Sequence, residues 1–260
     1  MKTLKWFGFF TLLLASVSFL SCEKVIDVDL NSDDPKVVIE ATFTAGETTH
    51  NVVITRTLNF DESAPYPTVD NAVVSVTDNL GNAQVLTFVG NGTYQTTAYP
   101  VVEGRTYTLT VVADGKTYTA LSTAPGLVPI DDLVVLSFEF GPDTINSLVP
   151  LRMDPAGVAN FYQFNLFNNG ERLDGIYLQD DAFTDGIQIQ QPIFDNEGSY
   201  ESGDTAFIEM YTIDEPVYNY FYALLQNQTA TPANPTSNFS GGCLGYFSTR
   251  SKDTASVIIP

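Results

Sequence analysis

The amino-acid sequence predicts a mainly β protein with one short helix. Apolar and polar residues alternate in short runs, and this alternation is the period of a half-buried strand. Turn residues separate the runs, and Asp114-Gly115 between two alternating runs predicts a hairpin. A helical spacing of apolar residues occurs in one segment, which begins after Asp214.

The first half of the chain predicts a series of short antiparallel strands. Alternation begins soon after Cys22, where Ile26, Val28 and Leu30 share one face. Further strands are predicted at residues 36–43, 49–56, 72–77, 83–89, 93–97, 105–111 and 116–122. This many short strands within about 100 residues is typical of an immunoglobulin-like sandwich, which we predict for residues 22–123. The disulfide of antibody domains is missing, so the prediction concerns the architecture alone.

The second half stays rich in predicted strands but is less regular. Residues 124–130 carry two prolines and a glycine, which predicts a linker between two domains. Residues 131–260 are predicted to form a second β-rich domain with strands at 133–140, 148–153, 160–167 and 204–213. The helix follows them. Asp214 suits the N-cap and Pro216 the first turn, and a length of about 12 residues is expected. Its helical spacing is carried by Val217, Phe221, Leu224 and Leu225.

The N-terminus predicts export and lipid attachment. Lys2 and Lys5 precede an apolar run over residues 6–20, which is short because a membrane-spanning helix needs roughly 20 residues. The run ends in Phe-Leu-Ser-Cys, which resembles the lipobox of bacterial lipoproteins, where the cysteine is acylated and becomes the first mature residue. We predict a signal peptide at residues 1–21 and a membrane anchor of several acyl chains on Cys22, since stable anchoring needs more than one chain. The alternatives are an ordinary cleaved signal and an uncleaved anchor.

The charge of the chain argues against nucleic acid as a partner. The 260 residues include 11 basic and 31 acidic ones. Removing residues 1–21 also removes Lys2 and Lys5, which leaves 9 basic residues and a net charge of −22. A surface this negative repels nucleic acid and anionic lipid, and it suits a solvated envelope protein.

The sequence predicts no catalytic residue and no cofactor. It has no phosphate-binding loop, no paired-histidine zinc motif and no nucleophile elbow. Its one histidine, His50, shares a strand face with Val52 and Ile54 and is interpreted as structural. Cys243 stands alone once Cys22 is acylated, and a buried, inert thiol is favoured over a reactive one. A hydrolase that uses a pair of carboxylates stays open as an alternative.

Acidic residues are densest between residues 174 and 204. Oxygen-rich loops can hold calcium, but no spacing here matches a known calcium loop. We therefore interpret the segment as a solvated irregular stretch and predict no metal ligand. Three Asp-Thr-apolar tripeptides resemble glycosylation sites of some envelope bacteria, but such tripeptides are common by chance.

Aromatic residues gather on the predicted helix and beside a glycine-rich loop. Tyr218 and Tyr222 belong to the helix, and Phe239 and Tyr246 flank the loop around residues 234–242. Such residues pack between layers in one interpretation. In the other, Tyr218, Tyr222, Phe239 and Tyr246 bind a partner or ligand, because tyrosine offers area and a hydroxyl at low entropic cost.

Several stretches together carry a family resemblance. They are SCEKVIDVDL, DPKVVIEA, GRTYTLTV with DGKTYTA, and NPTSNFSGGCLGYFSTRS. They resemble the bacterial outer-membrane lipoproteins of the family called domain of unknown function 4249. The closing stretch of that family usually has a small residue where Cys243 stands, which supports an inert thiol.

The resemblance implies a role but no chemistry. Proteins of this family are typically encoded beside TonB-dependent outer-membrane receptors. The chain is therefore expected to be an accessory or binding lipoprotein of a nutrient-importing β-barrel, and there is no catalytic residue to carry over. An envelope hydrolase and a structural or adhesion surface lipoprotein are the alternatives.

Overall fold

The computed structural model describes residues 34–59, 62–141, 143–195, 198, 200–227 and 234–260. The signal peptide, Cys22 and the strand predicted around residues 26–30 lie outside the described residues. Residues 34–260 form one compact unit, and its described part is mainly β with a single helix, as predicted. No helix among the described residues is long and apolar enough to cross a membrane.

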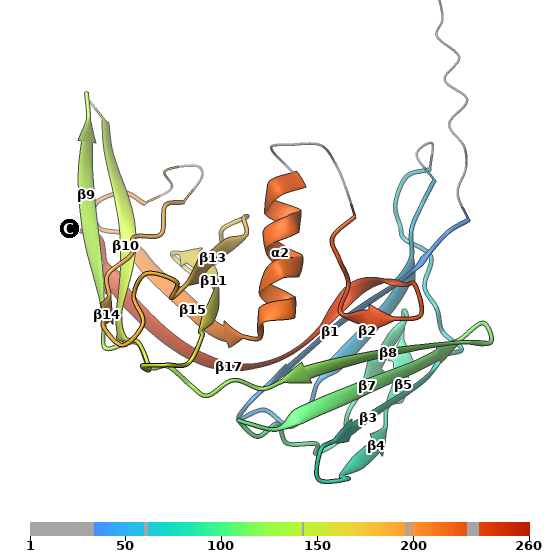
Figure 1. Ribbon diagram of the computed structural model, residues 1–260. Helices are drawn as coiled ribbons and strands as arrows, with labels where there is room; N and C mark the ends of the chain where they lie inside the picture. Colours follow the sequence, from blue (N-terminus) through green and yellow to red (C-terminus); the bar gives the residue numbers. More distant parts are fainter. Residues whose placement is uncertain (1–33, 60–61, 142, 196–197, 199, 228–233) are drawn as a thin grey trace, which may run out of the picture. The chain divides into compact units, whose positions relative to one another are not determined.

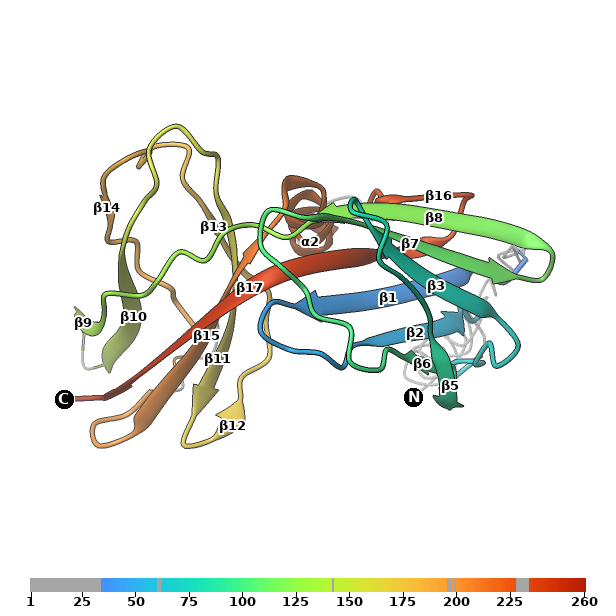
Figure 2. The same cartoon turned by 90° about the horizontal axis from the view of Figure 1, so that it is seen from below.

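The first half of this unit is a sandwich of two sheets (Figures 1 and 2). One face consists of β1 (Val37–Thr44), β2 (Asn51–Arg56), β6 (Thr93–Gln95) and β5 (Thr87–Gly90), in that order. The other is a five-stranded sheet of β16 (Phe239–Ser240), β8 (Lys116–Thr123), β7 (Thr106–Ala113), β3 (Val73–Asp78) and β4 (Ala83–Val85). The predicted hairpin at Asp114-Gly115 joins β7 to β8, with Gly115 at φ +72°.

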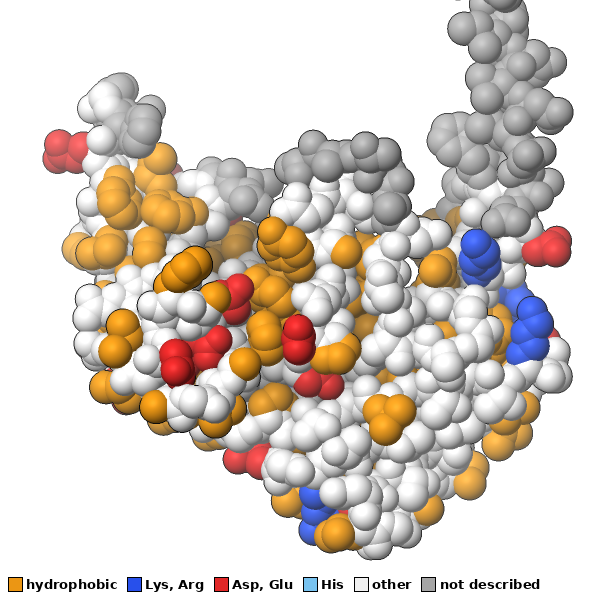
Figure 3. All heavy atoms as spheres, viewed as in Figure 1, with side chains coloured by type: hydrophobic (Ala, Val, Ile, Leu, Met, Phe, Trp, Pro, Cys, Tyr) orange, Lys and Arg blue, Asp and Glu red, His pale blue; other side chains and the backbone are white. Residues whose placement is uncertain are grey.

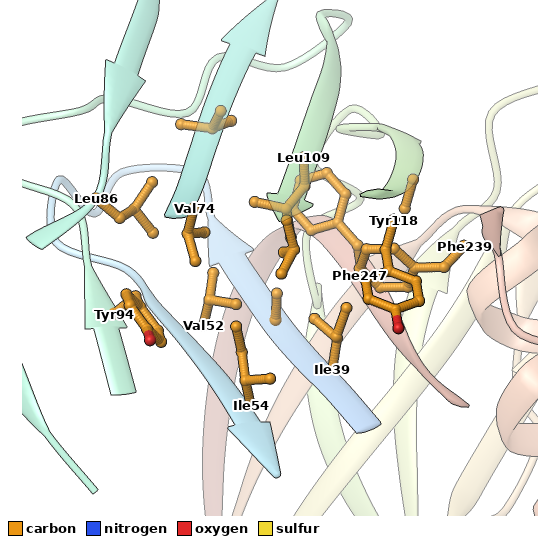
Figure 4. Close-up of a cluster of buried hydrophobic side chains, with 14 of the residues drawn as sticks. Ile39, Val52, Ile54, Val74, Leu86, Tyr94, Leu109, Tyr118, Phe239 and Phe247 are labelled. Atoms are coloured by element: carbon orange, nitrogen blue, oxygen red, sulfur yellow. The ribbon is translucent and has the colours of Figure 1, made fainter. Parts of the chain in front are cut away.

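A hydrophobic core lies between the two sheets because each strand buries alternate residues. Ile39 of β1, Val52 of β2 and Leu109 of β7 are all fully buried. Figure 4 shows these side chains gathered in one cluster with others from both sheets. The predicted strand alternation of the first half is therefore confirmed by which side chains are buried.

The second half adds strands to the same large sheet and builds a second core. The sheet continues through β17 (Leu244–Ile258), β15 (Thr205–Ile213), β11 (Phe161–Asn168) and β12 (Glu171–Arg172), and β13 (Tyr177–Asp180) also pairs with β11. A separate sheet contains β9 (Asp132–Phe140), β10 (Asp143–Met153) and β14 (Gln188–Ile189). Leu148, Tyr162, Phe164 and Ile208 fill the core between them.

The strand β17 links the predicted domains 22–123 and 131–260. Its first part pairs in parallel with β1 over residues 244–250, and its second part pairs antiparallel with β15 over residues 251–258. It therefore belongs to both halves, as Figure 1 shows. Phe239, Cys243 and Phe247 complete the first core, so the sandwich needs residues from the far end of the chain.

The predicted linker connects the two cores. Residues 124–130 contain no strand or helix. Ala124 is buried in the first core and Val128 in the second. The Ile130 amide donates to Asp253 of β17 at 2.8 Å, so the segment is held against the shared strand.

Candidate functional site: an aromatic helix between two cavities

The helix α2 (Glu215–Asn227) starts where the sequence predicts. Asp214 is its N-cap residue, and its Oδ2 accepts hydrogen bonds from the Ser122 hydroxyl at 2.7 Å and the Thr123 amide at 3.2 Å. Burial raises the pKa of the Asp214 carboxyl, although these hydrogen bonds oppose the rise. The cap therefore ties the first turn of the helix to the end of β8.

One side of α2 packs on the large sheet. Val217 is fully buried with Tyr211 and Ile213 of β15. The rings of Phe221 and Tyr246 lie 4.8 Å apart between centroids, in edge-to-face geometry. Burial raises the Tyr246 pKa to about 12, which reflects its enclosed position between helix and sheet. Tyr246 therefore contributes mainly to packing between helix and sheet.

Another side of α2 carries a stacked pair of tyrosines. The rings of Tyr218 and Tyr222 are 6.0 Å apart and inclined by 15°. Tyr218 also lies 5.0 Å from the ring of Phe161, and its hydroxyl donates to Asp180 Oδ2 at 3.0 Å. Tyr222 has 46% of its surface exposed, so it is available to a partner.

A cavity of about 640 Å³ lies along β1 and β2. Glu40 lines it and is the strand-register neighbour of Tyr246 on β17, so the cavity adjoins the aromatic contacts of α2. The Tyr66 side chain forms part of the wall and is itself 60% exposed. The wall also includes Val38, Thr55, Thr57, Leu58, Asn59, Glu62 and Ala64. Two carboxylates and a tyrosine give this cavity an acidic, amphipathic lining.

A second cavity, of about 450 Å³, lies on the Tyr218 side of the helix. Its wall consists of Asp180, Phe183, Thr184, Gln190 and Gln191. Asp180 accepts the hydrogen bond from Tyr218, and this links the cavity to the stacked tyrosines. On the face seen in Figure 3, acidic side chains lie among hydrophobic ones in this part of the molecule.

Phe239 lies in the core, which agrees with the interpretation in which these aromatic residues pack between layers. It is 7% exposed and packs with Phe247 and Cys243 in the first core. The Asn238 side chain holds the loop by donating to the Phe247 carbonyl and accepting from the Phe247 amide, at 2.7 and 3.0 Å. The loop around residues 234–242 therefore covers the first core and closes the sandwich.

The two residues interpreted as inert are both buried. Burial raises the pKa of the Cys243 thiol to about 11, so the reactive thiolate is scarce at neutral pH. His50 stacks on Phe43 with ring centroids 4.6 Å apart, and its Nε2 donates to the Tyr99 carbonyl at 3.0 Å. Both residues stabilise the first core.

The structure also assembles a group of carboxylates that the sequence did not indicate. Asp154, Asp181 and Asp185 each place an oxygen within 4.8 Å of the others. Asp181 and Asp185 belong to the acidic segment 174–204, but Asp154 follows β10 and lies outside it. No sequence signal joins Asp154 to the other two, because β10 and β13 are far apart along the chain. Elsewhere in the segment, Asp204 accepts hydrogen bonds from Asn168 and Asn169, so it stabilises a turn.

A family model described as Domain of unknown function (DUF4249) matches residues 23–256. No curated protein matches the chain. Among solved structures, the chain is similar to a two fibronectin type-III domain segment from chicken tenascin, with 12% identity over 87% of this chain and 99% of that one. The TM-score of this match is 0.26.

Proposed function

Because the chain belongs to the family described as Domain of unknown function (DUF4249), we propose that it is an outer-membrane lipoprotein that binds a TonB-dependent nutrient importer. In this proposal Cys22 carries the acyl chains, and the unit formed by residues 34–260 is the binding module. The apolar run that ends in Ser21-Cys22 supports the anchor. The strong negative charge of the chain supports a solvated position beside the membrane.

The exposed aromatic side of α2 is the observation that carries the binding role. Tyr222 is 46% exposed and stacks on Tyr218, which a hydrogen bond to Asp180 holds in place. A tyrosine that is already ordered loses little side-chain entropy when a partner covers it. A cavity on either side of the helix offers space for side chains of that partner. The helix and its flanks therefore resemble a binding surface more than a catalytic centre.

Purification from native membranes in mild detergent tests the partnership. We expect one β-barrel receptor to co-purify with the wild-type chain. Tyr222→Ala should weaken this association by more than 1 kcal/mol, because an ordered aromatic ring at the centre of an interface contributes strongly. Its thermal stability should stay near that of wild type, because nearly half of the side chain is exposed.

Phe88→Ala is the matched control for this experiment. Phe88 is 42% exposed but lies on β5, at the end of the large sheet away from the strands beside α2. It should leave both binding and stability nearly unchanged. The binding role is wrong if no barrel co-purifies, or if Tyr222→Ala and wild type bind equally well. Separately, Cys22→Ser should release the chain from the membrane fraction or leave it as the unprocessed precursor.

A further inference from the structure

Three carboxylates converge from two separate parts of the chain. Asp154 follows β10, Asp181 follows β13, and Asp185 lies in the turn after it. One oxygen from each lies within 4.8 Å of the other two. Calcium binds oxygen at about 2.3–2.6 Å, so two ligands of the same ion are at most about 5 Å apart. The three oxygens therefore fit around a single ion.

Hydrogen bonds hold each carboxylate but do not neutralise its charge. The Tyr162 hydroxyl donates to Asp154 at 3.1 Å, the Asn160 amide to Asp181 at 2.8 Å and the Gly157 amide to Asp185 at 2.6 Å. No lysine or arginine within the described residues forms an ion pair with any of the three. The group is thus positioned without a cationic partner in contact.

Arg152, two residues before Asp154 in the sequence, directs its hydrogen bonds to other groups. Arg152 is fully buried, and its guanidinium lies 4.2 Å from the centre of the Tyr162 ring. It donates to the Pro150 carbonyl at 3.1 Å and to Gln179 Oε1 at 2.8 Å. One guanidinium leaves an excess of two negative charges when all three carboxylates are ionised. A divalent cation would balance this excess.

A buried amide oxygen without a partner is the independent observation. Asn160 is 5% exposed, and its Oδ1 is buried with no hydrogen-bond partner. Asn160 lies directly before β11, two residues from Tyr162, whose hydroxyl donates to Asp154. The main-chain amide of Asn160 contacts Asp181. An acceptor buried in this position needs a donor or a cation.

A second unpartnered oxygen lies in the turn between two of the carboxylates. Thr184 Oγ1 is buried and has no hydrogen-bond partner. Thr184 also lines the cavity of about 450 Å³ on the Tyr218 side of α2. Asp185 is exposed, so water can reach the group and fill positions that the protein leaves open.

We propose that Asp154, Asp181, Asp185 and Asn160 bind a calcium ion, with Thr184 beside them. The donors are all oxygen, and they combine carboxylates with a neutral amide, as calcium sites do. Magnesium is smaller, requires near-ideal octahedral geometry and gives up its water reluctantly, so a site of several protein oxygens favours calcium. The ion would join the end of β10 to the turn after β13. The site adjoins the cavity that the binding proposal uses, because Thr184 lines that cavity. Calcium binding by the purified chain does not involve the importer, so either proposal can fail without the other.

Calorimetric titration of the full chain with calcium chloride tests the proposal. The protein is purified in detergent, treated with EDTA and freed of the chelator. We expect one calcium per chain, with a dissociation constant on the order of 10⁻³ M or lower. Calcium should also raise the melting temperature, because an ion that binds only the folded state stabilises it. Magnesium should bind at least about tenfold more weakly.

Asp185→Asn and Asp174→Asn form the matched pair of variants. Asp185 is the exposed ligand, so its replacement should leave the fold intact and weaken calcium binding at least about tenfold. Asp174 is exposed in the same acidic segment but lies outside the group, and its replacement should leave calcium affinity unchanged. The proposal is overturned if the wild type neither binds calcium nor melts later with it. Equal binding by Asp185→Asn, or equal affinity for magnesium, would also overturn it.

Discussion

His50 illustrates how burial determines the chemistry of a single residue. It is 2% exposed, stacked on Phe43 and hydrogen-bonded to the Tyr99 carbonyl. A carbonyl can only accept, so Nε2 carries the proton in the neutral ring. Burial lowers the pKa of His50 below its ordinary value of 6.5, although the carbonyl and the nearby Glu47 favour the charged form. The imidazole is therefore neutral at physiological pH and acts as a core residue.

This lowered pKa predicts a loss of stability in mild acid. The unfolded chain takes up a proton on His50 near pH 6.5, whereas the folded chain takes it up only at lower pH. The stabilisation is therefore complete above pH 6.5 and is lost as the pH falls through the folded pKa. NMR titration of the single imidazole should give a value below 6.5. In urea unfolding, His50→Gln should remove this part of the pH dependence, and a titration at or above 6.5 would contradict the prediction.

At the scale of elements, the parallel pairing of β1 with β17 depends on a glycine. Gly245 has φ +94°, and it is the register neighbour of Ile39. A Cβ atom at this position would overlap the Ile39 carbonyl. Glycine therefore allows the first part of β17 to approach β1 closely enough to extend the sheet.

Alanine at two nearby glycines should separate backbone strain from this close approach. Gly242 also has a positive φ, +83°, but a Cβ there would meet nothing within 4 Å. Gly242→Ala should therefore cost about 1 kcal/mol of unfolding free energy. Gly245→Ala should cost about 1–3 kcal/mol more, because β1 or β17 must move. Urea denaturation of both variants measures this difference in unfolding free energy. Equal costs would contradict the prediction, because they would show that the overlap with the Ile39 carbonyl adds nothing to the backbone strain.

At the scale of the whole molecule, the two ends of the described chain are held in one sheet. β17 pairs with β1 and with β15. In addition, the Thr249 amide of β17 donates a hydrogen bond to the Ser122 hydroxyl oxygen of β8 at 2.8 Å. Phe239, Cys243 and Phe247 lie in the core of the first sandwich. The first half of the chain is therefore incomplete without the last.

This arrangement predicts that residues 34–123 do not fold alone. The fragment lacks three buried side chains of its core, and burial of each large apolar one contributes about 1.5–3 kcal/mol. That loss is comparable with a typical domain stability of about 5–15 kcal/mol. Its NMR spectrum should show the narrow amide dispersion of an unfolded chain, whereas residues 34–260 should give a dispersed spectrum. A dispersed spectrum from residues 34–123 would contradict this expectation and support two independent domains.

Local patterns in the sequence determined the strands of the first half, the start of α2 at Asp214 and the turn at Gly115. Alternation, capping and turn geometry depend on neighbouring residues, so one sequence is enough to predict them. β17 was not predicted, because it buries Ser248, Thr249 and Ser251 and so lacks an alternating apolar face.

Only the tertiary structure decided which distant residues meet. It paired the last strand with the first, placed Phe239 in the core and left Tyr222 exposed. It also brought Asp154, which follows β10, to the carboxylates of Asp181 and Asp185, which follow β13. These contacts arise from sheet pairing between segments far apart in the chain, and local sequence carries no record of such pairing.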